Sequence, residues 1–346
     1  MAILGAGAIG IDLGSEYTRV AIPGEGVALR EPTRALVSAA DAQDVLAVGT
    51  DARAMAGRTG EDVRLAEPIL CGAVADVELS ALLMVALTEK AVGRKKPFEK
   101  SALIVNAPTG LTKAERAALS QAVASVGARR TVALSSPVAA ALGAGVDLSR
   151  PKGMILLSIG GGAIEVAVLS MYATVAARFI RGGSARLDEA ITRWYWRNKG
   201  IVISQRTAEQ LKIEIGTARA DADEEEEPVL LKGREAATGK PLSIETNGDD
   251  IRKALEEPIR EIVDAMRLAL YQSPPELAAD ILDEGILLTG GGTLLHGLAE
   301  RMTAETGLTA HLSEHPEYDA ALGIAMAAPD EALLRALSAA GSLTDV

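Results

Sequence analysis

The sequence contains an internal repeat. The stretches Ile11-Asp12-Leu13-Gly14-Ser15 and Leu157-Ser158-Ile159-Gly160-Gly161 match at an offset of 146 residues, and the match continues into Arg19-Val20-Ala21 and Glu165-Val166-Ala167. Each copy is a short apolar run, a glycine-containing turn and a second apolar run, which predicts the two strands of a hairpin. Glycine lets the backbone approach an anion closely, with its N–H groups directed at that anion. The repeat therefore predicts two similar lobes whose hairpin tips hold a polyphosphate between them.

Length and composition predict an intracellular protein of two domains. A chain of 346 residues is longer than one hydrophobic core usually supports, so we expect two domains of roughly 150 residues each. The single cysteine, Cys71, excludes a disulfide framework, and the three histidines stand in unrelated contexts. We expect a cytoplasmic protein, because the N-terminus lacks basic residues before Arg19 and no stretch approaches roughly 18 uninterrupted apolar residues. The net charge of −12 argues against general affinity for nucleic acid.

One early motif is misleading. Gly5-Ala6-Gly7-Ala8-Ile9-Gly10 matches the G-x-G-x-x-G fingerprint of dinucleotide-binding folds. That fingerprint requires a strand before it and a helix that opens on its last glycine. Only four residues precede Gly5, and the first hairpin follows Gly10, so we reject the dinucleotide-binding interpretation.

Strand and helix patterns alternate along the rest of the chain. Thr112 and Glu115 form a T-x-x-E capping box at the start of a helix that ends at Gly127. An amphipathic helix follows Ile251, and Pro258 is expected either to kink it or to begin a second segment. The acidic run 221–228 is interpreted as a solvated loop rather than a binding site. Further predicted elements are a strand at 131–134, helices at 138–145, 184–198 and 207–217, and hairpins at 154–172 and 229–244.

A third glycine-rich turn follows a buried strand near the C-terminus. Leu287-Leu288-Thr289 leads into Gly290, Gly291 and Gly292, and an apolar helix is predicted from Thr293 to Met302. A strand, three glycines and a helix allow the backbone to pass close to a flat ligand. Glycine turns also serve tight packing, so this motif gains specificity from its order after the two hairpins.

Together these motifs resemble the MreB/Mbl family of bacterial actins, within the superfamily of actin, sugar kinases and heat-shock chaperone ATPases. The resemblance covers nearly the whole chain. It rests on Ile11-Asp12-Leu13-Gly14, Ile159-Gly160-Gly161-Gly162, Leu288-Thr289-Gly290-Gly291-Gly292 and stretches that separate MreB from kinases and chaperones, such as Lys212-Ile213-Glu214-Ile215-Gly216 and Pro274-Pro275-Glu276-Leu277.

The resemblance implies an α/β actin-like fold of two duplicated lobes, each with a ribonuclease-H-like core and a small inserted subdomain. The implied division is IA at 1–31, 76–145 and 320–346, IB at 32–75, IIA at 146–181 and 248–319, and IIB at 182–247.

The resemblance also implies that ATP or ADP binds with Mg²⁺ in the cleft between the lobes. Asp12 is the expected metal-site residue, although a strand-end aspartate also caps turns. Glu209 and Lys212 are the expected adenosine contacts; alternatively they form a solvent-exposed i, i+3 pair on a helix. The nucleotide-binding residues implied are Asp12, Gly14, Ser15, Gly160, Gly161, Gly162, Glu209, Lys212, Gly290, Gly291 and Gly292.

Several residues depart from the family pattern. MreB proteins usually carry an acidic pair where this chain has Ser135 and Ser136, and an aspartate where it has Ser158, so the catalytic residues are not identified. Phosphoryl transfer depends on a positioned water and on charge neutralisation by metal, so we expect weak or absent ATP hydrolysis. Glu16 and Tyr17 replace small residues in the first hairpin, and a carboxylate there repels phosphate.

The family implies partners as well. We expect head-to-tail filaments of the chain itself, with other MreB-type filaments and cell-wall synthesis proteins as partners at the inner face of the cell membrane. A loop with Phe98 among Arg94, Lys95, Lys96 and Lys100 is the candidate for peripheral membrane contact, or else a solvated turn with one packed phenylalanine. The alternative functions are a degenerate paralogue that binds a partner filament without polymerising, and a superfamily kinase or chaperone-type ATPase.

Overall fold

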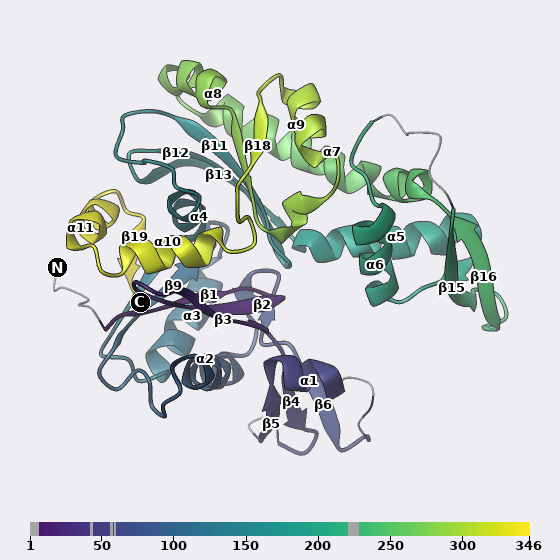
Figure 1. The fold of residues 1–346 in the computed structure, drawn as a ribbon, viewed down its shortest axis with the longest axis horizontal. Coiled ribbons are helices and arrows are strands. Elements are labelled where there is room, and N and C mark those ends of the chain that lie inside the picture. The colour runs from purple at the N-terminus through teal and green to yellow at the C-terminus, as the bar shows by residue number, and fades with distance from the viewer. Residues whose placement is uncertain (1–6, 42–43, 56–57, 59, 221–227) are drawn as a thin grey trace.

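The computed structural model describes residues 7–41, 44–55, 58, 60–220 and 228–346. Two lobes, each built on one large mixed β-sheet, lie one above the other in Figure 1. The lower sheet has the order β19-β10-β9-β1-β2-β3, and the upper sheet has the order β13-β12-β11-β17-β18. The lower strands are β1 (Ile9–Leu13), β2 (Tyr17–Ile22), β3 (Gly26–Pro32), β9 (Ala102–Ala107), β10 (Arg130–Ser135) and β19 (Leu343–Asp345). The upper strands are β11 (Met154–Ile159), β12 (Ala163–Ser170), β13 (Ala173–Arg181), β17 (Ile286–Thr289) and β18 (Ala310–Leu312).

The two sheets repeat one topology. β1 pairs antiparallel with β2 and parallel with β9, while β11 pairs antiparallel with β12 and parallel with β17. In each lobe a third strand, β3 or β13, then pairs antiparallel with the hairpin. The hairpins predicted from the sequence repeat are therefore confirmed, and they occupy equivalent positions in the two lobes.

Helices cover the sheets and bury their apolar faces. α3 (Lys113–Ser125) begins with the predicted capping box, in which Thr112 accepts from the Glu115 N–H and Glu115 accepts from the Thr112 N–H. α7 (Gly248–Gln272) packs on β12 and β13 through a face that includes Ile259, Ile262 and Met266. The other helices are α2 (Val77–Val92), α4 (Ser136–Gly143), α8 (Ala278–Glu284), α9 (Leu298–Thr306), α10 (Asp319–Ala327) and α11 (Glu331–Ala339), with 3₁₀ turns η1 (Pro275–Leu277) and η2 (Gly291–Leu294).

α4 and α10 pack against each other between the two sheets (Figure 1). A Cβ on Gly143 would lie 1.8 Å from the Asp319 carbonyl oxygen, and a Cβ on Gly323 would lie 1.8 Å from the Ala139 carbonyl oxygen. Only glycine permits so close an approach of two helix backbones. This contact places the N-terminus of α10 beside the cleft between the lobes.

Two smaller groups of elements extend from the lobes. The first contains β4 (Ala35–Ser38), β5 (Val45–Val48), β6 (Val63–Ala66) and α1 (Gly49–Met55), and it lies at the bottom of Figure 1. The second lies at the right and contains α5 (Gly183–Lys199), α6 (Gln205–Ile215), β14 (Ile201–Val202), β15 (Val229–Glu235) and β16 (Pro241–Thr246). A short hairpin, β7 (Ile69–Leu70) and β8 (Ala73–Val74), links the first group back to α2.

Two helix predictions need correction. α7 continues through Pro258, so the alternative of a second segment is wrong and the kink stays a prediction. The start of the helix predicted from Thr293 to Met302 is wrong, because η2 takes in Gly291, Gly292 and Thr293, and α9 begins only after the left-handed Gly297. The acidic run lies almost wholly outside the described residues.

Candidate functional site

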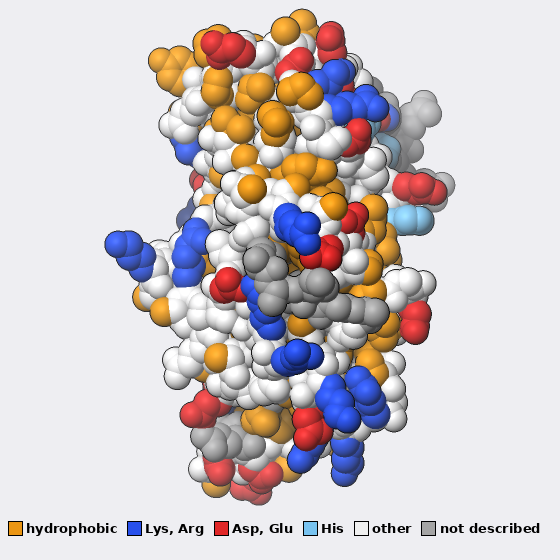
Figure 2. All heavy atoms as spheres, turned by 90° about the vertical axis from the view of Figure 1, so that its left-hand side faces the viewer, with side chains coloured by type: hydrophobic (Ala, Val, Ile, Leu, Met, Phe, Trp, Pro, Cys, Tyr) orange, Lys and Arg blue, Asp and Glu red, His pale blue; other side chains and the backbone are white. Residues whose placement is uncertain are grey.

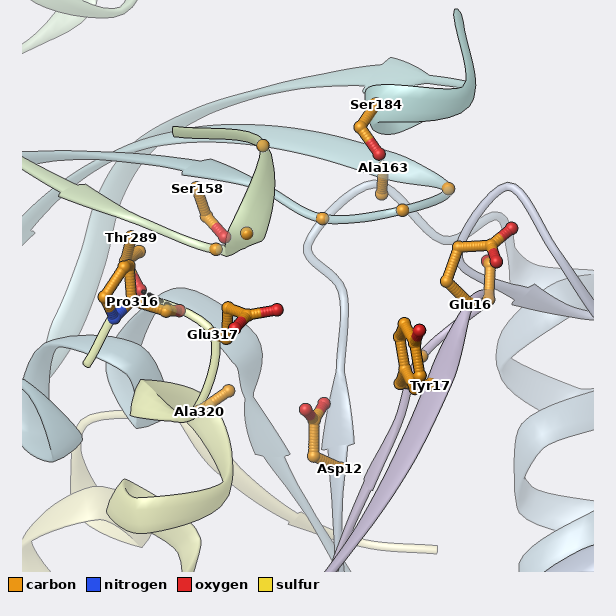
Figure 3. A pocket seen from close by; sticks show the side chains of 18 of the residues that line it. Asp12, Glu16, Tyr17, Ser158, Ala163, Ser184, Thr289, Pro316, Glu317 and Ala320 are labelled. Atoms are coloured by element: carbon orange, nitrogen blue, oxygen red, sulfur yellow. Dashed lines mark hydrogen bonds between the residues drawn. The ribbon is translucent and has the colours of Figure 1, made fainter. Parts of the chain in front are cut away.

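A cleft with a volume of about 460 Å³ lies between the two lobes (Figure 3). Both hairpin tips, the three-glycine turn and α6 contribute to its walls. Every residue that the sequence assigned to nucleotide binding lines this cleft, namely Asp12, Gly14, Ser15, Gly160, Gly161, Gly162, Glu209, Lys212, Gly290, Gly291 and Gly292.

The three serines at expected acidic positions do not all face the cleft. Ser136 and Ser158 line it, and Ser136 Oγ lies 3.4 Å from the Asn106 amide nitrogen. Ser135 Oγ instead lies 3.4 Å from Thr174 Oγ1. Ser136 and Ser158 are thus the positions at which a carboxylate would reach the cleft.

The tips of the two hairpins touch. A Cβ on Gly161 would lie 2.3 Å from Glu16 Cγ, and a Cβ on Gly162 would lie 2.2 Å from Ser15 Oγ. Side chains at these glycines would therefore separate the lobes. Ser15 Oγ also accepts a hydrogen bond from the Gly72 N–H at 2.9 Å, which ties the first tip to the β7–β8 hairpin.

The backbone of the second tip is fixed by the start of α5. The Gly160 carbonyl accepts from the Ser184 N–H at 2.8 Å, and the Gly161 carbonyl accepts from the Ala185 N–H at 3.1 Å. In a trans peptide the N–H points opposite to the carbonyl oxygen, so the N–H groups of Gly161 and Gly162 point away from α5. In Figure 3 the turn before Ala163 lies between Ser184, at the start of α5, and Asp12, so the side of the tip away from α5 faces the cleft. Successive N–H groups in this arrangement suit an anion.

The glycines of the third motif pack against the second hairpin. A Cβ on Gly290, whose φ is 82°, would lie 2.5 Å from the Ile159 carbonyl oxygen, and a Cβ on Gly292 would lie 2.2 Å from Ile159 Cγ2. Close packing therefore requires glycine at both positions. Gly291 is less crowded, with the Glu317 side chain at 3.4 Å. The turn thus brings its backbone to the cleft wall next to Glu317.

Lys212 is not a solvent-exposed partner of Glu209. Its side chain is 10% exposed, and its Nζ lies 2.7 Å from Asp188 Oδ1. Burial raises the pKa of Asp188 to about 6, although the positive charge of Lys212 opposes that rise. The pair joins α5 to α6 at the edge of the cleft, so the alternative interpretation of Glu209 and Lys212 as a solvent-exposed i, i+3 pair is wrong, and their contact with adenosine stays a prediction.

Asp12 lies on β1 and points into the cleft (Figure 3). Its Oδ2 accepts from Arg19 Nη1 at 3.0 Å, and the two side chains are 10% and 12% exposed. Burial raises the pKa of Asp12, and the Arg19 guanidinium partly offsets this rise. An aspartate already paired with an arginine is a poor ligand for a cation.

The donor set around Asp12 does not fit the expected magnesium site. Mg²⁺ prefers six oxygen ligands in near-octahedral geometry, usually from one or two carboxylates, waters and phosphates. Asp12 Oδ2 faces a guanidinium, whose positive charge repels a metal ion.

The sequence did not identify Glu165 as a cleft residue. Its buried carboxyl group accepts from the Thr109 N–H at 2.7 Å and from the Thr109 hydroxyl at 2.8 Å, and burial raises its pKa. Glu165 lies on β12 and Thr109 follows β9, so the contact joins the two lobes at the cleft. Two sequence signals pointed to Glu165: it matches Arg19 in the repeat, and it belongs to the second hairpin motif on which the family resemblance rests.

Other lining residues were missed because they come from distant segments. Arg30 on β3 donates to Glu317 at 2.9 Å, and its guanidinium carbon lies 3.7 Å from the centroid of the Tyr17 ring. Glu16, which was expected to repel phosphate, is paired with Arg34 at 2.8 Å. The guanidinium of Arg34 thus offsets part of the negative charge at the hairpin tips.

The prediction that Phe98 contacts a membrane is wrong. Its side chain is 1% exposed and belongs to the core that contains Leu87 and Leu103, so it is not available to a membrane. Arg94, Lys95, Lys96 and Lys100 are exposed around it. Their loop lies on the left of Figure 1, and the face that Figure 2 shows carries several Lys and Arg side chains in its lower half. Among the described helices, none combines the length and the low polarity needed to cross a bilayer.

Comparison with known proteins agrees with this geometry. A family model described as MreB/Mbl protein matches residues 6–335. The chain is 37% identical over 311 residues to the cell shape-determining protein MreB of Escherichia coli, which covers 89% of each chain. It is 34% identical over 317 residues to the cell shape-determining protein Mbl of Bacillus subtilis, which covers 91% of this chain and 93% of Mbl.

Solved structures share the fold. The structure of MreB5 of Spiroplasma citri bound to AMPPNP superposes with a TM-score of 0.86 at 26% identity and covers 96% of this chain and 98% of MreB5. The double helical filament of MamK superposes with a TM-score of 0.76 at 18% identity, over 93% of this chain and 98% of MamK, which is a likeness of fold. The fold is therefore actin-like, as the sequence motifs predicted.

Proposed function

The chain belongs to the MreB/Mbl family, and on that premise we propose that it is an actin-like cytoskeletal protein that binds ATP or ADP between its lobes and assembles into filaments involved in cell shape. One observation carries the proposal: the two repeated glycine tips touch each other in a single cleft that also contains the three-glycine turn. Relatives support it, since the MreB5 structures from Spiroplasma citri, 26% and 27% identical to this chain, are bound to AMPPNP and ADP. We retain the four-subdomain division as part of this proposal.

In the proposed binding mode the phosphate tail lies between the tips. The N–H groups of Gly161 and Gly162 are the anion donors, and Ser15 contributes a hydroxyl from the facing tip. The base lies between the three-glycine turn and α6, where Glu209 supplies a hydrogen-bond acceptor and Lys212 a donor. The cleft therefore offers anion donors at one end and a flat glycine-lined wall at the other.

We include weak or absent ATP hydrolysis in the proposal. Ser136 and Ser158 line the cleft with hydroxyl groups where the family usually has carboxylates. A hydroxyl neither carries the charge that holds a metal nor accepts a proton as readily as a carboxylate does. Glu165 is buried in the cleft, but its carboxyl group is engaged by Thr109.

Head-to-tail assembly of the chain follows from the same premise. A heterologous contact that does not close on itself generates a filament. Partners from cell-wall synthesis, other MreB-type filaments and a position at the inner face of the cell membrane are proposed on family membership. The loop with Arg94, Lys95, Lys96 and Lys100 offers the positive charge for contact with anionic lipids, without a contribution from Phe98.

Electron microscopy of the purified chain tests the proposal. We expect filaments when ATP or AMPPNP is present and single particles without nucleotide. Filaments that appear only when a second MreB-type protein is added would favour a non-polymerising paralogue. A chain that neither assembles nor changes the assembly of such a partner would contradict a cytoskeletal role.

A further inference from the structure

A row of charged side chains crosses three neighbouring strands at the cleft. Asp12 on β1 lies opposite Arg19 on β2, and Arg19 lies opposite Arg30 on β3. Asp12 accepts from Arg19 at 3.0 Å at one end of the row, and Glu317 accepts from Arg30 at 2.9 Å at the other end. All four residues line the cleft. The two arginines therefore occupy facing positions on neighbouring strands, and each is hydrogen-bonded to one carboxylate.

Two neighbouring arginines in this position destabilise the sheet, so their presence requires an explanation. Like charges directly opposite each other on a sheet are destabilising. The side chain of Arg19 is 12% exposed and that of Arg30 is 30% exposed, so water screens their repulsion only in part. The carboxylates of Asp12 and Glu317 reduce the repulsion, and the Tyr17 ring stacks on Arg30.

The two arginines also retain unused donors. In the part of the chain that the structure describes, the Nε atoms of Arg19 and Arg30 are both buried without a hydrogen-bond partner. A buried donor without an acceptor is unfavourable, and buried polar groups are usually satisfied. Both Nε atoms are closed off from water, so an anion in the cleft would reach them only if the guanidinium groups turned toward it. It would then supply acceptor oxygens and negative charge together, and a guanidinium group matches the geometry of phosphate oxygens.

The same row is what makes Asp12 unsuitable for magnesium. Its Oδ2 is held by Arg19, so a metal ion at Asp12 would have to displace a buried guanidinium that carries positive charge. Two guanidinium groups supply two positive charges, as does one divalent cation. Unlike a metal ion, they are part of the chain and need no ligand set.

We propose that Arg19 and Arg30 take the place of the divalent cation, so that this protein binds the phosphate tail of ATP or ADP without a metal. The inference rests on the proposed binding of nucleotide in the cleft. Asp12 holds Arg19 in place when no anion is present, and Glu317 does the same for Arg30. When the phosphates bind, both arginines turn their remaining donors to phosphate oxygens.

Equilibrium binding of a fluorescent ATP analogue tests the inference in two buffers, one with Mg²⁺ and one with EDTA. We expect the dissociation constants of the unmodified chain in the two buffers to agree within about threefold. Binding only in the Mg²⁺ buffer would overturn the inference and leave the proposed nucleotide site intact. Absence of binding in both buffers would overturn the nucleotide site itself and the inference with it.

Substitutions at Arg19 and Asp12 test whether metal-free binding depends on the row of charged side chains, and a substitution at Arg129 is the control. Arg19→Leu should weaken binding in EDTA at least tenfold, whereas Arg129→Leu, which changes an exposed arginine before β10, should leave it unchanged. Asp12→Asn should tighten binding in EDTA at least threefold, because it removes a negative charge and releases Arg19 for the phosphates. A metal-binding Asp12 predicts the opposite, a loss of affinity in the Mg²⁺ buffer on the same change.

A folding control distinguishes the loss of the binding site from the loss of the fold. Circular dichroism and thermal unfolding establish whether Arg19→Leu is folded. Should it not be, Arg30→Gln replaces it, since this side chain is less buried and its loss should weaken binding in EDTA at least fivefold. A folded Arg19→Leu or Arg30→Gln that binds as tightly as the unmodified chain would show that the arginines only balance the carboxylates, and would overturn the inference.

Discussion

Gly162 and Ser15 lie so close that a methyl group on the glycine would come within 2.2 Å of the serine hydroxyl oxygen. The two residues belong to equivalent turns in the two lobes, 147 positions apart in the chain. Their contact brings the glycine backbone of one lobe against the hydroxyl of the other, and we propose that both bind the phosphate tail. The closed cleft therefore depends on the absence of a side chain at Gly162.

Gly162→Ala should force the two tips apart. Overpacking a tight contact costs about 1–3 kcal/mol, and here it should also widen the phosphate site. We expect at least a tenfold loss of nucleotide affinity in a titration with a fluorescent ATP analogue. Gly7→Ala is the matched control, because a Cβ on Gly7 meets nothing within 4 Å. Equal affinity for both variants would show that the tips do not form the site.

Asp188 should titrate well above the ordinary range of an aspartate. Burial raises its pKa to about 6 in the folded protein, against 3.8 for its ordinary value. The folded state then binds more protons than the unfolded state between about pH 4 and 6, so the contribution of Asp188 to stability falls as pH rises through this range, by up to about 3 kcal/mol. Chemical denaturation at pH 4.5 and 7.5 measures the free energy of unfolding of both proteins. The stability of Asp188→Asn relative to the unmodified chain should be greater at pH 7.5 than at pH 4.5. An equal difference at both pH values would contradict this account.

Glu115 and Arg181 connect α3 of one lobe to β13 of the other, with 2.9 Å between Glu115 Oε1 and Arg181 Nη1. The hydrogen bond from Arg181, followed by those from Thr112, lowers the pKa of Glu115 to about 2. A lowered pKa means that the stabilisation is present above about pH 4.5 and is lost as pH falls through about 2.

Glu115→Gln keeps a side chain that can complete the capping box but removes the charge. We expect a loss of less than about 1 kcal/mol at pH 7, because the pair is partly exposed, and a smaller difference at pH 2.5. Urea unfolding at the two pH values measures this difference in the free energy of unfolding between Glu115→Gln and the unmodified chain. A loss that grows as the pH falls would be incompatible with the lowered pKa.

Phe98 and the cations around it should have separable effects. Phe98→Ala should lower the free energy of unfolding by about 3–5 kcal/mol, because the ring is fully buried. Replacing Arg94, Lys95, Lys96 and Lys100 by glutamine should leave stability nearly unchanged and reduce sedimentation with anionic vesicles. Sedimentation that is unaffected by the four changes would exclude this loop as a membrane contact.

Carboxylates restored at the two cleft serines should raise hydrolysis. Ser136→Glu combined with Ser158→Asp places acidic groups at the positions that reach the cleft, whereas Ser135→Glu changes the serine that lies beside Thr174. We expect the double variant to release phosphate from ATP at least tenfold faster than the unmodified chain, and Ser135→Glu to have no such effect. Rapid hydrolysis by the unmodified chain would refute the proposal of weak activity.

The sequence predicted the features that depend on local pattern. The repeated glycine turns, the Thr112 and Glu115 capping box and the amphipathic face of α7 were all readable from residues close together in the chain. Their structures follow from backbone freedom, from hydrogen bonding at a helix start and from periodicity. The glycines of the two repeated turns line the cleft as the repeat predicted, and the three glycines at 290–292 line it as the family resemblance implied.

The missed and mistaken features depend on contacts between distant segments. The pairing of Asp12 with Arg19 requires the strand register, and that of Arg30 with Glu317 joins residues 287 positions apart. The direction of Phe98 depends on the core beneath its loop, while its neighbours in sequence are exposed cations. The left-handed Gly297 that delays α9 stands within a run that otherwise favours a helix.

The most direct test of the account is a structure of the protein crystallised with AMPPNP. The account predicts the triphosphate between Ser15 and the backbone N–H groups of Gly161 and Gly162, with the base beside Gly290, Gly291 and Gly292. A nucleotide bound on another surface, or hairpin tips that enclose no phosphate at saturating AMPPNP, would contradict it.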